Sequence, residues 1–216
     1  MSVFIAFAIV ISSFSFRASA TASTPTLSEV EFESAPLLSS TQFISSDDEH
    51  CELKPAGHAV RKGAIYGLVP VNVYVLQILA KQPEKFRQSE TDVIASLKAA
   101  APVQFHLTFL RTFPASKLAD TFNEGLSVNK ITPKKMSSEL AQVLDAIRSM
   151  SEFKKGSVLT ITTTWKAKQT TFFLESSTGE SKTITGPEEM AEQFYLIWFG
   201  KSADPKVKPF SKDSFQ

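Results

Sequence analysis

Cysteine is scarce in this 216-residue sequence, where Cys51 stands alone. A single cysteine cannot form an internal disulfide, so the fold has to be stable without one. The Cys51 thiol is therefore either inert or paired with a second chain. The inert interpretation is favoured, because no accompanying pattern of His and Asn residues indicates a nucleophilic cysteine.

The sequence also lacks an excess of charge of either sign. Lys and Arg together number 23, Asp and Glu together number 22, and the formal net charge is +1. No run of basic residues of the kind that binds nucleic acid or anionic lipid is present. We therefore expect no nucleic-acid partner.

Signatures of phosphate, metal and cofactor sites are missing as well. There is no Gly-rich phosphate loop and no Gly-x-Ser-x-Gly elbow. The chain has three His residues, and none has the spacing of a zinc site. The acidic run at residues 47–49 is typical of a solvated turn, because three adjacent carboxylates do not converge on one ion without a dedicated loop. The sequence predicts no metal and no cofactor.

The only long apolar run, residues 3–11, is shorter than the roughly 20 residues that a membrane span needs. It precedes Ala18-Ser19-Ala20, the small-x-small pattern of a signal-peptidase site. We expect residues 1–20 to be a signal peptide and the mature protein to be periplasmic or secreted. The alternative is an uncleaved anchor, because no basic residue precedes the apolar run and Arg17 lies beside the cleavage site.

Phenylalanine, in contrast, is abundant, with 18 residues. Each Phe side chain stabilises a fold by about 1.5–3 kcal/mol when it is fully buried. These residues can build a core without disulfides, and they can equally line an apolar ligand cavity. Composition alone leaves both possibilities open.

The length of the chain predicts one domain, which we place at residues 51–205, and its pattern contains both strands and helices. Residues 21–50 are interpreted as a flexible lead-in with a possible edge strand, and residues 206–216 as a loose tail. Alternation with a period of two, or a short apolar run, predicts strands at 58–66, 71–79, 103–111, 158–165, 170–174 and 183–185. A period of 3.6 predicts helices at 91–101, 114–126, 137–150 and 187–199.

Two of the predicted strands carry polar residues on one face. In residues 103–111, His106 lies on the polar side of the alternation. In residues 158–165, the threonines at 160, 162 and 164 share one face, which is typical of a solvated sheet surface.

Four short phrases in this order resemble a known family. Residues 56–79 contain Ala-Gly-x-x-x-Arg followed by Asn-Val-Tyr-Val-Leu-Gln-Ile-Leu, and residues 107–126 form a strand-then-helix signature. Residues 153–161 begin Phe-Lys-Lys-Gly, and residues 194–200 read Phe-Tyr-Leu-Ile-Trp-Phe-Gly. Over about residues 55–205 the chain resembles the bacterial chalcone isomerase-like proteins. The resemblance implies an α+β fold, the open-faced β-sandwich, with a large antiparallel sheet, helices packed on one face, and an apolar cleft between them.

The resemblance also implies where a ligand would bind. In the non-catalytic, fatty-acid-binding branch of the family, an Arg and a Tyr meet the ligand carboxylate, and Arg61 with Tyr74 or Tyr66 matches that pair. The resemblance to plant chalcone isomerase implies a Tyr and an Asn on the helix after the signature strand, but this chain has Pro114 and Thr121 at about those positions. We therefore assign no catalytic residue.

Three functions remain open at this point. The leading one is a non-catalytic binding protein for a small amphipathic ligand such as a fatty acid, with Arg61 at the polar end of the cleft. The second is an intramolecular lyase or isomerase that acts on an enone-like metabolite. The third is a structural or interaction domain without a ligand, in which Arg61 pairs with a carboxylate and the aromatic residues only form the core.

Overall fold

The computed structural model describes residues 23–44, 50–65, 69–87 and 93–201. Its strands are β1 Thr24–Phe32, β2 Ala35–Ile44, β3 His50–Ile65, β4 Val69–Ala80, β5 Val103–Phe109, β6 Val158–Lys166, β7 Gln169–Ser176 and β8 Ser181–Pro187. Its helices are the short 3-10 helix η1 Pro83–Lys85 and the α-helices α1 Val93–Ala100, α2 Ala115–Val128, α3 Ser138–Arg148 and α4 Glu188–Phe199.

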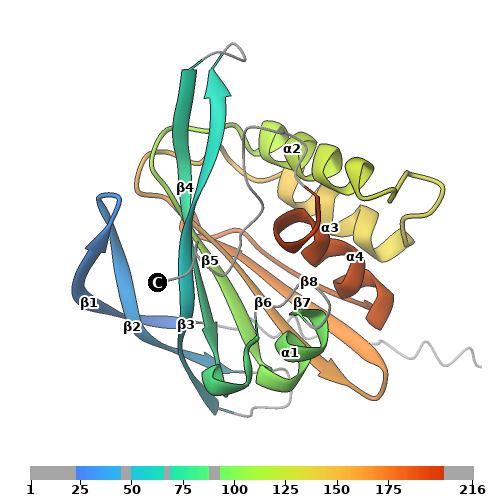
Figure 1. The fold of residues 1–216 in the computed structure, drawn as a ribbon, viewed down its shortest axis with the longest axis horizontal. Helices are drawn as coiled ribbons and strands as arrows, with labels where there is room; N and C mark the ends of the chain where they lie inside the picture. The colour runs from blue at the N-terminus through green and yellow to red at the C-terminus, as the bar shows by residue number, and fades with distance from the viewer. Residues whose placement is uncertain (1–22, 45–49, 66–68, 88–92, 202–216) are drawn as a thin grey trace, which may run out of the picture.

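The strands follow one another as neighbours in the order β1 to β8, and every pair is antiparallel. Helices α2, α3 and α4 cover one face of the sheet, as Figure 1 shows. The predicted α+β architecture, a large antiparallel sheet with helices on one face, is confirmed. The predicted signal peptide at 1–20 and the tail at 206–216 lie outside the described residues.

The core between sheet and helices forms because the inward sides of β4 to β7 are apolar. Along β4, Tyr74, Leu76 and Ile78 point towards the helices, and Leu107 and Phe105 of β5 lie opposite the last two. Helix α4 presents Phe194 and Trp198 to this layer, one helical turn apart. Residues 73–80 are buried throughout, as expected for a strand that is covered on both faces.

The second face of the sheet is covered by the β1–β2 hairpin. Strand β3 connects the layers: its first residues pair with β2, and the rest of the strand pairs with β4. Gln77 of β4 fastens the hairpin to the sheet, because its side-chain amide donates to the Leu38 carbonyl and its side-chain oxygen accepts from the Leu38 N–H, both at 2.8 Å. Cys51 of β3, which pairs with Phe43 of β2, is buried in an apolar cluster with Phe43 and Leu53.

The expectation that the threonines of residues 158–165 form a solvated surface is wrong, because the hairpin covers this face of the sheet. Thr160 and Thr162 are 7% and 0% exposed, and His106 beside them on β5 is 7% exposed. The side-chain amide of Gln104 donates to the Thr162 hydroxyl at 2.9 Å. Alternation correctly separated the two faces of these strands, but the polar face lies inside the protein because the hairpin folds over it.

Candidate functional site

Arg61 and Tyr74 lie directly opposite each other on β3 and β4. Cross-strand partners project from the same face of a sheet, and Tyr74 belongs to the core beneath the helices. Immediately after this pair the register shifts, so that Lys62 pairs with Asn72 and Val73 is the extra residue. Such a bulge bends the strand and changes the direction of nearby side chains. The pair therefore sits at an irregular point of the sheet, on its helix face.

Tyr74 is held in a fixed position by its neighbours. Its side chain is 3% exposed, and its hydroxyl oxygen accepts a hydrogen bond from the Trp198 indole N–H at 3.0 Å. The ring of Phe109 meets the Tyr74 ring edge-on, with 5.9 Å between centroids. Burial raises the pKa of Tyr74, although the nearby Arg61 cation and the Trp198 bond act in the opposite direction. The phenol is thus protonated at neutral pH.

Arg61 is partly exposed, and its positive charge acts to lower the pKa of Tyr74. Among the described residues, no salt bridge or hydrogen bond involves its guanidinium. A carboxylate partner for Arg61, which would have favoured a purely structural role, is therefore not found in the part of the chain that the structure describes. Tyr66, the other proposed partner, lies outside the described residues.

The two side chains together offer donors and no acceptor. A guanidinium has five N–H donors in a planar fork, and it cannot accept. The Tyr74 oxygen already accepts from Trp198, so the proton of its hydroxyl can be given to another group. A carboxylate supplies acceptors for both, and it forms two parallel charge-assisted bonds with an Arg. The chemistry of the pair therefore suits the carboxylate of an acid.

Pro114 and Thr121, at the positions of the Tyr and Asn of plant chalcone isomerase, add no hydrogen-bond donor to the Arg61–Tyr74 pair. Pro114 precedes the first residue of α2 and has no side-chain donor. The hydroxyl of Thr121 donates to the Lys117 carbonyl of its own helix at 2.9 Å. Among the described residues, no hydrogen bond or ion pair joins Pro114 or Thr121 to Arg61.

An aromatic cluster fills the space between the sheet and α4. Trp198 lies edge-on to Phe105, Phe122 and Phe194, with centroid distances of 5.0–5.2 Å. Tyr195 is fully buried and shares a hydrogen bond of 2.6 Å with the Thr163 hydroxyl. An apolar ligand whose polar end meets Arg61 would therefore lie beside this cluster and not within it.

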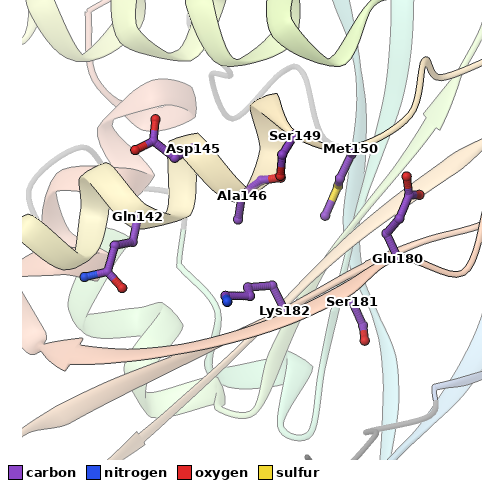
Figure 2. Close-up of a pocket in the computed structure, with 8 residues that line it drawn as sticks. All are labelled: Gln142, Asp145, Ala146, Ser149, Met150, Glu180, Ser181 and Lys182. Carbon is purple, nitrogen blue, oxygen red and sulfur yellow. The ribbon is translucent and has the colours of Figure 1, made fainter.

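A groove of about 380 Å³ lies elsewhere, between α3 and the start of β8 (Figure 2). Its lining includes Asp145 and Lys182, which are exposed. The Glu180 carboxylate accepts from the Ser151 backbone N–H at 2.7 Å and from the hydroxyls of Ser176 and Thr178. These bonds hold the pKa of Glu180 at about 2. Glu180 therefore has a structural role, because it ties the β7–β8 turn to the segment after α3.

Two further features bear on the function classes. No three His, Cys, Asp or Glu side chains of the described residues come close enough together to hold a metal ion. Within the same residues, no helix combines the length and apolar character of a membrane span.

Comparison with solved structures places the fold. A crystal structure of an Arabidopsis thaliana fatty-acid binding protein matches 80% of this chain and 93% of its own, with a TM-score of 0.53 and 12% sequence identity. The fold is the chalcone isomerase-like α+β fold. No protein-family model and no curated protein matches the sequence. At 12% identity the likeness establishes the architecture, whereas the bacterial family suggested by the four phrases stays a prediction.

One residue of the candidate site was not anticipated as part of it. Trp198 was expected on the apolar face of the last helix, but its bond to the Tyr74 hydroxyl joins residues 124 positions apart. No pattern in the sequence signals a contact over that separation. The apolar character of both segments only predicts that each is buried.

Proposed function

We propose that this protein binds a small amphipathic acid, such as a fatty acid, and that Arg61 and Tyr74 hold its carboxylate. The observation that carries the proposal is the pair of facing donors on one face of the sheet, for which the described residues provide no carboxylate. The structural likeness to a fatty-acid binding protein supports the same class of ligand. The apolar part of the ligand would lie beside Tyr74, whose aromatic neighbours Phe109 and Trp198 are buried.

Loss of the Arg61 charge should remove the preference for an acid over its ester. The probes are cis-parinaric acid and its methyl ester, which share a fluorescent chain and differ in the charge at one end. Charge-assisted hydrogen bonds contribute about 1.5–3 kcal/mol, so the full-length protein should bind the acid about 10- to 100-fold more tightly than the ester. In Arg61→Met we expect nearly equal affinities.

The matched control is Lys62→Met, which removes the same charge from the next residue of β3, where the side chain is exposed. This variant should keep the preference for the acid. Equal binding of acid and ester by the unmodified protein would contradict the proposal, as would an equal loss of preference in both variants. Thermal unfolding of each variant shows whether it is folded.

We also propose that the protein is exported and acts in the periplasm or outside the cell. The support is the apolar run at residues 3–11 and the small residues that end at Ala20. Expressed in a bacterium with a secretion pathway, the protein should be recovered outside the cytoplasm and begin near Thr21. N-terminal sequencing tests this, and a cytoplasmic protein that begins at residue 1 or 2 would contradict it.

A further inference from the structure

A second hollow lies on the opposite face of the sheet, beneath the β1–β2 hairpin. It has two adjoining parts that share Pro25, His106 and Val158 in their lining. The larger part has a volume of about 540 Å³. The smaller part has a volume of about 270 Å³. The hollow is separate from the Arg61 site, because His106 lies on the side of β5 that faces away from the helices.

The larger part has mostly apolar walls. Leu38 of β2 lines it from the hairpin, and Leu110 and Val158 line it from the sheet. Most residues that line the smaller part are polar, among them Thr41, Gln104 and the neighbouring Thr160. A molecule that fills both parts therefore meets an apolar environment at one end and hydrogen-bonding groups at the other.

Two buried polar atoms at the polar end have no partner. The His106 Nδ1 and the Thr41 Oγ1 make no hydrogen bond in the structure, and the two residues are 7% and 1% exposed. Leaving such a group buried and unsatisfied is unfavourable, because folding removes it from water without giving it a new hydrogen bond. The adjacent Gln104 and Thr162 bond to each other, so the unsatisfied atoms are not a general property of this face. They are the two buried side-chain atoms without a partner among the described residues that line the hollow.

The charges around His106 indicate an uncharged ligand. Burial lowers the pKa of His106 to about 4, so the imidazole is neutral at pH 7. Glu175 lines the polar end, and its carboxylate accepts from the Ser23 hydroxyl at 2.8 Å. Lys155 lines the apolar part but is exposed. His58 lies on the same face, two strands from β5, and burial lowers its pKa too.

We propose that this hollow is a binding site for an uncharged molecule with an apolar body and one hydroxyl group. The body occupies the larger part, and the hydroxyl bonds to His106 and Thr41. A hydroxyl both donates and accepts, which matches a neutral imidazole and a threonine hydroxyl. An anion is disfavoured by Glu175, and that carboxylate already accepts hydrogen bonds from the protein.

The test compares 2-naphthol with naphthalene, which has the same rings without the hydroxyl. By fluorescence titration at pH 7, the full-length protein should bind 2-naphthol about tenfold more tightly, as expected for one or two neutral hydrogen bonds. His106→Leu and Thr41→Val should each reduce this preference towards one. Val158 lines both parts of the hollow. The larger side chain in Val158→Trp should therefore occupy part of the hollow and weaken binding of both compounds.

Lys62→Met, at an exposed position outside both sites, serves as the control and should leave both affinities unchanged. The fatty-acid site is tested with different probes, so the two proposals fail or succeed independently. Because His106→Leu removes an unsatisfied polar atom, its melting temperature should not fall below that of the unmodified protein at pH 7. Absence of 2-naphthol binding would overturn the proposal. So would an unchanged preference in a folded His106→Leu or Thr41→Val variant.

Discussion

Replacing Gln77 with leucine is expected to lower the free energy of unfolding by about 2–6 kcal/mol. The amide of Gln77 satisfies both the N–H and the carbonyl of Leu38, in a region where both residues are 3% exposed. Leucine has a similar size but leaves the two backbone groups without partners. Each orphaned group costs about 1–3 kcal/mol. Urea unfolding of the variant measures the loss.

Gln104→Leu provides the matched control for that substitution. Gln104 is also a glutamine on the hairpin face and is 1% exposed, but its amide donates to one side-chain hydroxyl, that of Thr162. We expect Gln104→Leu to cost about 1–3 kcal/mol. If Gln77→Leu costs no more than Gln104→Leu, then Gln77 does not hold the hairpin on the sheet as described.

Stability should also fall on acidification because of His106. The pKa of His106 is about 4 in the folded protein and close to its ordinary value of 6.5 in the unfolded chain. The unfolded chain therefore takes up the proton first as the pH falls. The contribution of the neutral imidazole to the free energy of unfolding is therefore complete above pH 6.5 and is lost progressively down to about pH 4. The difference between these pKa values corresponds to about 3 kcal/mol.

Comparison with His106→Leu isolates this contribution from the other titrating groups. His58 also has a lowered pKa and acts in the same direction, whereas burial raises the pKa of Glu175, which favours the folded state as the pH falls. Urea unfolding at several pH values between 7.5 and 4.5 should show a shallower loss in His106→Leu than in the unmodified protein. Equal slopes in the unmodified protein and in His106→Leu would contradict the assignment.

Local patterns predicted much of the fold. The alternation in residues 103–111 and the helical periods in 114–126 and 137–150 depend only on neighbours along the chain, and β5, α2 and α3 lie there. Pro187 at the start and Gly200 after the end likewise predicted a helix at 187–199, and α4 occupies Glu188–Phe199 with Pro187 as its N-cap. Such patterns identify which residues share a face, and the structure agrees on this for each of these elements.

What covers each face could not be predicted in the same way. The buried state of His106 and Thr160 depends on the hairpin at residues 24–44, which is fixed over them by Gln77 from another strand. Similarly, the pairing of Arg61 with Tyr74 depends on the register of β3 and β4 and on a bulge. The resemblance to a family placed these two residues together, but the role of Trp198 required the packing of α4 on the sheet.

The proposed function requires Arg61 and Tyr74 to bind the carboxylate of an acid on the helix face of the sheet. A crystal structure of the protein with palmitic acid shows whether they do. We expect a carboxylate within hydrogen-bonding distance, about 2.7–3.2 Å, of both the Arg61 guanidinium and the Tyr74 hydroxyl. A palmitate bound elsewhere, with its carboxylate away from both residues, would rule out this role for Arg61 and Tyr74.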